Sequence, residues 1–169
     1  MPNVAKFSRV LMALHDLGLL KDDACKEPVT LFIRQATEQR HWHTTAHFRS
    51  KAAAAFIRRE NPATAAAYQR LCVSKLRHEH VVPNAAVYRL ICEEPNITLD
   101  FIEGTLRRYG VRATITREED ATLPRHRMPD GFFQAGHALY RSPLARYTAA
   151  GLADSLEALT GPSWFSHEV

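Results

Sequence analysis

The segment LRHEHVVPN places two imidazoles and a carboxylate directly before two β-branched residues and a proline. The three consecutive titratable residues are His78, Glu79 and His80. Histidine changes its charge near neutral pH and can act as a general base, and a carboxylate can hold a hard divalent cation. The two valines that follow are typical of a buried strand. We therefore expect at least one of the three side chains to face an interior or a cleft.

The spacing of apolar residues predicts the elements that position these groups. In the first half, the apolar stripe recurs at helical spacing, and the alanine run at 52–55 strongly favours a helix. We expect four helices there: residues 4–20, Pro28 to about Gln39, Thr45–Arg59, and a helix opened by Asn61-Pro62 that continues to Lys75.

After residue 75 the spacing of the apolar residues changes. The segment HVV predicts a short strand, and the alternation in VRATIT predicts a second, half-buried strand. The segment TREE at 116–119 is a capping box, which predicts a short helix that begins there and stops at Pro124. The remaining expected helices begin at Asn84, at Thr98 with an αL end at Gly110, and at Ser142-Pro143 with an end near Leu159.

The expected elements indicate a mainly α structure with a small β component, an α+β fold, and length and composition indicate one compact domain or one domain with a small helical appendage. The 169 residues are 46% hydrophobic and 24% charged, which is enough to bury a core. We expect a helical region over 1–75 and a mixed region with a C-terminal helix over 76–169. No apolar run approaches the roughly 20 residues of a membrane helix, so no membrane association is expected. Three cysteines without a C-x-x-C pair favour a reducing, cytoplasmic environment.

The balance of charge favours a polyanionic partner. The formal net charge is +4, and most of the 22 basic residues are arginines, several of them clustered. Arginine matches phosphate groups bidentately, which makes it common in nucleic-acid interfaces. We expect phosphate contacts from Arg117, Arg125 and Arg127. The alternative is an ordinary solvated basic face.

The segment EHVVP, followed by a second strand and a capped acidic helix, resembles the HNH, or ββα-metal, nuclease family. In that family the first strand carries an Asp/Glu-His-x-x-Pro signature. The resemblance covers roughly residues 76–152 and implies Mg²⁺ or Mn²⁺, with Glu79 as a metal ligand and His80 as the general base that activates water. The segments TREEDATL, RMPDGF and ARYTAAGL also resemble a group of bacterial and phage-type proteins with the same EHVVP core.

The rest of the site is incomplete relative to the family. A second metal ligand, commonly histidine or asparagine, is expected on the helix after the second strand. Here that helix offers acidic residues, of which Glu119 already serves the capping box. Asp120 and His126 are therefore the expected further ligands, with Glu118 as an alternative, and Arg127 is expected to be catalytic together with His80.

Three functions follow from these observations. The first is a metal-dependent endonuclease that hydrolyses phosphodiester bonds in DNA, with RNA as the alternative substrate. The second is a catalytically degenerate phage or prophage protein on the same scaffold, which binds and inhibits a host nucleoprotein or defence complex. The third is an interaction module whose N-terminal helices bind a protein partner.

Overall fold

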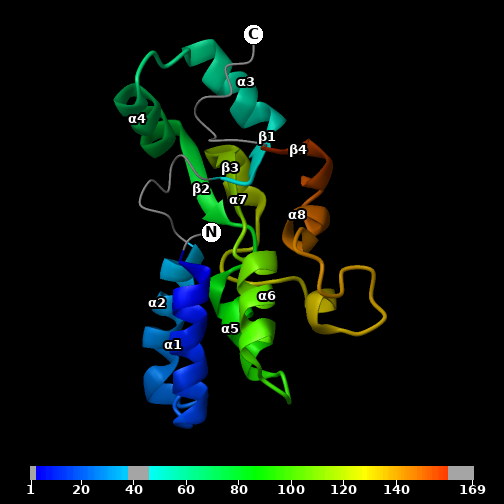
Figure 1. The fold of residues 1–169 in the computed structure, drawn as a ribbon. Coiled ribbons are helices and arrows are strands. Elements are labelled where there is room, and N and C mark those ends of the chain that lie inside the picture. The colour runs from blue at the N-terminus through cyan, green and yellow to red at the C-terminus, as the bar shows by residue number, and fades with distance from the viewer. Residues whose placement is uncertain (1–2, 38–45, 160–169) are drawn as a thin grey trace. The chain divides into compact units, whose positions relative to one another are not determined.

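The computed structural model describes residues 3–37 and 46–159 of the chain. Helices dominate, and four short strands form one sheet, which confirms a mainly α fold with a small β component (Figure 1). The chain divides into two compact units, each built from two separate stretches. These units do not follow the division expected at residue 75. The first joins Met1–Arg40 to Val82–Val111, and the second joins His41–Val81 to Arg112–Val169.

The first unit is entirely helical where it is described. Its helices are α1 (Val4–Asp16), the 3₁₀ turn η1 (Asp23–Cys25), α2 (Lys26–Thr37), α5 (Asn84–Cys92) and α6 (Leu99–Tyr109). Each α-helix turns an apolar stripe inward, as the sequence period predicts. The fully buried side chains of this core include Leu11, Ile33, Leu90, Ile102 and Leu106.

The ends of these helices follow local chemistry. The side chain of Thr98 accepts a hydrogen bond from the backbone N–H of Phe101 and so caps α6, as expected. The expectation for Gly110 is wrong, because its φ is −75° and not left-handed. Glycine is needed there for space instead: a Cβ at this position would lie 2.2 Å from Cγ2 of Thr37.

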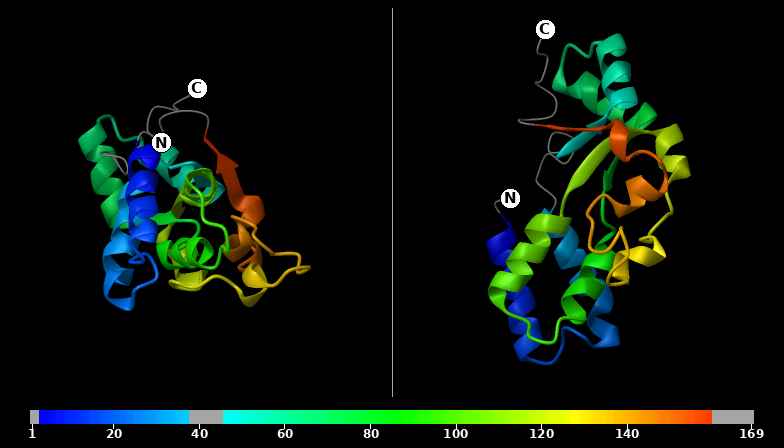
Figure 2. Two further views of the ribbon diagram at one scale, coloured as in Figure 1. Left: turned by 60° about the horizontal axis from the view of Figure 1, so that its bottom comes forward. Right: turned by 90° about the vertical axis from the view of Figure 1, so that its right-hand side faces the viewer.

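The second unit contains the sheet. Its strands are β1 (Phe48–Ser50), β2 (Leu76–His80), β3 (Arg112–Thr116) and β4 (Leu156–Ala158), in the order β2-β3-β1-β4 (Figure 2). The pairs β2–β3 and β1–β4 are antiparallel, and β1–β3 is parallel. Strand β3 is internal and is buried on both faces from Arg112 to Ile115, so the expectation of a half-buried strand is wrong.

Helices pack on the two faces of this sheet. They are α3 (Lys51–Glu60), α4 (Ala65–Lys75), α7 (Arg117–Thr122) and α8 (Ala145–Ala149), with 3₁₀ turns η3 (Asp130–Phe133) and η4 (Ala153–Ser155). On one face, α3, α4 and β2 share an apolar cluster that contains Ile57, Tyr68 and Leu76. None of the helices in the described ranges has the length and apolar character needed to cross a bilayer.

Two helices expected from the sequence are partly strands. The expected helix Thr45–Arg59 begins only at Lys51, because Phe48–Ser50 pairs with β3 and β4. The expected final helix is limited to Ala145–Ala149, and Leu156–Ala158 becomes the edge strand β4. Both strands are three residues long, too short to display a period of two. Long-range pairing overrides local helix propensity at these positions.

Ser50 connects three elements of the second unit. Its hydroxyl accepts from the backbone N–H of Ala53, which caps α3, and donates to Oε2 of Glu119 at 2.6 Å. The same carboxylate oxygen accepts from the backbone N–H of Thr116 at 2.9 Å. The expected capping box on α7 is confirmed, and its glutamate also reaches β1.

We predict that Ser50→Ala lowers the free energy of unfolding by about 1–3 kcal/mol, because it removes a helix cap and a charge-assisted hydrogen bond. Urea denaturation followed by circular dichroism measures the effect. Ser74→Ala is the matched control, because that exposed hydroxyl bonds to the Leu71 carbonyl of its own helix. It should change stability by no more than about 0.5 kcal/mol. Equal effects of the two substitutions would contradict the role given to Ser50.

Candidate functional site

The segment that carries the EHVVP signature forms β2 and the turn after it. Strand β2 pairs antiparallel with β3, and β3 leads directly into α7, which is the order of a ββα unit. Two helices of the first unit, α5 and α6, are inserted between the strands. The expected strand is therefore present, but it spans Leu76–His80 and ends before the two valines.

The regular pairing of β2 separates its titratable side chains. All five residues from Leu76 to His80 have partners in β3, so the strand is not bent within this ladder. Consecutive side chains of such a strand point to opposite faces. We call the face of Arg77 and Glu79 the carboxylate face, and the face of His78 and His80 the histidine face. Glu79 and His80 therefore do not meet at one site.

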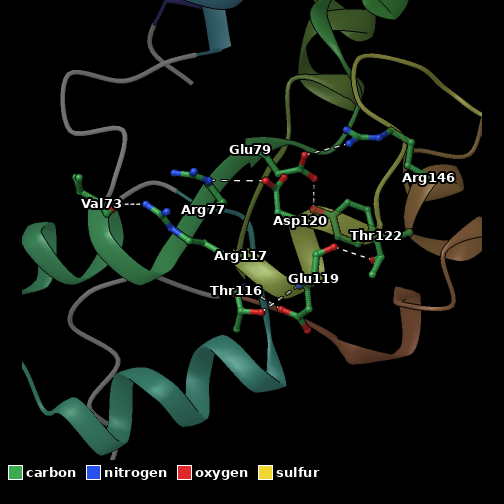
Figure 3. Close-up of polar contacts among 10 residues, drawn as sticks. Val73, Arg77, Glu79, Thr116, Arg117, Glu119, Asp120, Thr122 and Arg146 are labelled. Carbon is green, nitrogen blue, oxygen red and sulfur yellow. Dashed lines mark hydrogen bonds and ion pairs between the residues drawn. The ribbon is translucent and has the colours of Figure 1, made fainter.

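On the carboxylate face, Glu79 is held by two neighbouring residues of α8 (Figure 3). Nη2 of Arg146 lies 3.1 Å from Oε2 of Glu79, and the hydroxyl of Tyr147 donates to Oε1. Arg146 also donates through Nη1 to the carbonyl oxygen of His80 at 3.1 Å. The side chains of Arg146 and Glu79 are only 5% and 16% exposed, so this ion pair is largely withdrawn from water.

Burial governs the protonation of this group. It raises the pKa of the Glu79 carboxyl, while the charge of Arg146 and the hydrogen bonds from Tyr147 and Arg146 act in the opposite direction. Burial, followed by the charge of Glu79, raises the pKa of the Tyr147 hydroxyl well above its usual range. Tyr147 is therefore a hydrogen-bond donor at neutral pH, and both carboxylate oxygens of Glu79 are engaged.

Asp120 approaches the same face from α7. Its charge contributes to the raised pKa of Glu79, so the two carboxylates sense one another. Asp120 also lies 3.7 Å from Nε of Arg77, in a pair whose members are 29% and 46% exposed (Figure 3). Each carboxylate of this face therefore has its own arginine.

The other residues expected at the site lie on exposed surface. Arg125, His126 and Arg127 are all exposed in the loop after α7, and His126 has a left-handed backbone with φ of 57°. Arg117, also exposed, donates from Nη2 to the carbonyl oxygen of Val73 at 2.7 Å. Neither an ion pair nor a hydrogen bond links His126 or Arg127 to Glu79 within the described ranges.

The donor set around Glu79 does not fit a divalent metal. Its oxygens accept from a guanidinium and a phenol, both of which would have to leave before the carboxylate could coordinate a cation. In the ranges that the structure describes, no group of three His, Cys, Asp or Glu side chains could hold a metal ion. A hard cation needs several such oxygen ligands. We therefore derive no chemical step through a metal at Glu79.

The histidine face carries a second set of polar side chains. In register across the sheet, His78 lies opposite Thr114, and Thr114 lies beside Arg49 of β1. Nδ1 of His78 and the hydroxyl of Thr114 are 2.7 Å apart. Two residues further along β2, on the same face, His80 lies opposite Arg112. Arg49 and Arg112 are buried, at 7% and 3% exposure.

His47 fixes the backbone beside Arg112. Its Nδ1 accepts from the backbone N–H of Arg112 at 3.1 Å, which requires the neutral imidazole. Burial, followed by the charge of Arg112, lowers the pKa of His47 and favours this state. The histidine face thus combines two buried arginines with neighbouring imidazoles.

No local pattern in the sequence marks Arg49, Arg146 or Tyr147 as site residues. The last two belong to ARYTAAGL, a segment noted for its resemblance to other proteins, but the expected long helix gave no reason to direct it toward Glu79. Arg49 lies on a strand that was expected to be a helix. Comparison with models of known protein families, with curated proteins and with solved structures finds no match to this chain.

We predict that Glu79→Ala lowers the free energy of unfolding by about 3–5 kcal/mol, because it leaves Arg146 buried without its carboxylate. Replacing both partners by apolar residues, Glu79→Leu with Arg146→Met, should recover most of this stability, since no charge then stays buried. Urea denaturation measures both variants.

Asp120→Ala is the control for this experiment, because it breaks a partly exposed pair on the same face. Pairs of this kind contribute roughly 0.2–1 kcal/mol. If Glu79→Ala lowered the free energy of unfolding no more than Asp120→Ala does, the Glu79–Arg146 pair would not behave as a buried ion pair.

Proposed function

We propose that the protein binds nucleic acid through the basic surface of its second unit and does not cut it. The main support for this proposal is the uneven distribution of charge between the two units. In the second unit, the described residues 46–81 and 112–159 include 13 Lys and Arg and 8 Asp and Glu, a net charge of +5. In the first unit, residues 3–37 and 82–111 include 8 of each, a net charge of zero.

Most of the basic side chains of the second unit are accessible to a partner. The exposed ones are Lys51, Arg58, Arg59, Arg70, Lys75, Arg77, Arg117, Arg125 and Arg127. Figure 3 shows Arg77 of β2 directed to Asp120, and Arg117, at the start of α7, directed to the carbonyl of Val73. Exposed guanidinium groups of this kind contact phosphate oxygens without reading base identity. They supply affinity that depends strongly on salt.

The arrangement of β2 supports a protein that does not cut nucleic acid. A hydrolytic site of the ββα-metal type needs a carboxylate that is free to bind a metal and an imidazole on the same side. Glu79 is instead paired with Arg146 and Tyr147, and His80 belongs to the opposite face. These interactions favour the degenerate scaffold, a protein that binds a nucleic acid or nucleoprotein, over the endonuclease.

We predict that the joint replacement Arg117→Gln, Arg125→Gln, Arg127→Gln weakens binding to a 20-base-pair duplex and reduces its dependence on salt. For each phosphate that is no longer neutralised by an arginine, the log–log salt slope should fall by about 0.9. Fluorescence anisotropy at several salt concentrations measures the slope, and a single-stranded RNA probe of equal length distinguishes the preferred nucleic acid.

The matched control removes three exposed basic residues from the neutral first unit, with Lys6→Gln, Arg9→Gln and Lys21→Gln. This variant has the same net charge as the test variant and should retain the wild-type slope. An equal decrease of the slope in the two variants would mean that net charge, and not the surface of the second unit, determines binding.

We predict that the wild-type protein leaves plasmid DNA and RNA intact in the presence of Mg²⁺ or Mn²⁺ under conditions in which it binds them. His80→Ala should therefore behave as the wild type does in the same gel assay. Cleavage that requires the metal and falls by a factor of about 10²–10⁴ in His80→Ala, the usual contribution of a general base, would overturn this proposal and establish the nuclease.

A further inference from the structure

Arg49 of β1 is a buried cation whose main binding edge is not used. The residue is 7% exposed, and among the described residues its Nε and Nη2 atoms have no hydrogen-bond acceptor although both are buried. These two nitrogens form the side of the guanidinium that docks carboxylates and phosphates through two parallel hydrogen bonds. A guanidinium held in this way, without an acceptor, costs free energy that an occupant would recover.

A second donor lies near Arg49. The hydroxyl of Tyr68, on α4, is buried and makes no hydrogen bond of ordinary geometry in the described part of the chain. Burial and the side chain of Cys72 raise the pKa of Tyr68, and the charge and side chain of Arg49 act against this rise, so the three side chains are neighbours. Tyr68 keeps its proton at neutral pH, so its hydroxyl can donate a hydrogen bond to an anion. Burial also raises the pKa of the adjacent Cys72 thiol to about 11, so no thiolate is present to neutralise Arg49.

The surrounding sheet face adds positive charge and polar groups. On this face Arg49 lies between its two register partners, Thr114 of β3 and Glu157 of β4, and His78 of β2 lies one strand beyond Thr114. Strands are about 4.8 Å apart and alternate residues about 7 Å apart, so Arg112, two residues before Thr114, belongs to the same patch. The described strands contribute one carboxylate to this face, Glu157 of β4, which is exposed.

We propose that Arg49 and Tyr68 form a binding site for a single phosphate group on the histidine face, with Thr114, His78 and Arg112 around it. A buried guanidinium edge and a phenol donor suit an anion with several acceptor oxygens and more than one charge, which favours phosphate over a simple carboxylate. The burial of Arg49 limits the occupant to a small or terminal group, such as inorganic phosphate or the end of a nucleotide. The backbone of an intact duplex is too large for such a site.

This site is separate from the exposed arginines proposed to bind nucleic acid. It uses none of Arg117, Arg125 or Arg127, so either proposal can fail without the other. The variant that lacks those three arginines should retain phosphate binding at this site.

Thermal unfolding in sodium phosphate, compared with sodium chloride and sodium acetate at equal ionic strength, tests the proposal, and isothermal titration calorimetry gives the affinity. We expect a saturable rise in Tm with phosphate alone, because a ligand that binds only the folded state stabilises it. Arg49→Met should retain or raise the Tm measured without phosphate and should lower the affinity for phosphate at least about tenfold, because it removes two charge-assisted hydrogen bonds.

Tyr68→Phe provides a second variant, because it removes only the hydroxyl and preserves the packing of α4. It should also weaken phosphate binding. Arg58→Met, which removes an exposed arginine of α3, is the control and should bind phosphate as the wild type does. A 5′-phosphorylated dinucleotide compared with its 5′-hydroxyl form identifies the source: tighter binding than inorganic phosphate indicates a nucleotide end, and equal binding indicates free phosphate.

Three results would overturn the proposal. The first is a Tm in phosphate that rises no further than in chloride. The second is an undiminished response in Arg49→Met. The third is a saturable response to acetate equal to that in phosphate, which would make the site a carboxylate site.

Discussion

The alternation of side chains along β2 is the constraint on which the rest of the second unit depends. Five consecutive residues are paired with β3, and this ladder directs Glu79 to one face of the sheet and His80 to the other. Strand β3 cannot shift to relieve the constraint, because it lies inside the sheet and is buried on both faces. A one-residue slip would exchange the two faces entirely. The side chains of this one short strand therefore contribute to two chemically different surfaces on opposite faces of the sheet.

Each surface is completed by a different part of the chain. On the carboxylate face, α7 supplies Asp120 and α8 supplies Arg146 and Tyr147, so two segments distant in the sequence approach Glu79. A buried pair such as Glu79–Arg146 gains little over apolar packing, but either charge alone is costly. The pair thereby specifies where α8 docks. On the histidine face, Arg49 is buried near Tyr68 of α4, and part of its guanidinium has no acceptor among the described residues.

Local signals in the sequence predict the local parts of this structure and do not predict the long-range ones. The helices α1 and α6, the capping box at Thr116 and the strand β3 each leave a period or a capping residue that is visible within a few positions. The strands β1 and β4 are three residues long, and their stability comes from partners more than 60 residues away in the chain. The partner of Glu79 lies 67 residues further on, in a segment that sequence periodicity assigns to a longer helix. Its identity depends on packing between elements, which no local pattern records.

The net charge of the second unit, its exposed arginines and its engaged carboxylate together favour a binding protein that uses a nuclease-like order of strands and helix without nuclease chemistry. An anomalous-difference map from a crystal soaked with Mn²⁺ tests most directly whether Glu79 and His80 belong to separate sites. We expect no metal peak at Glu79, with Nη2 of Arg146 still within hydrogen-bonding distance of its carboxylate. A peak coordinated by Glu79, with His80 on the same side and Arg146 displaced, would contradict this expectation.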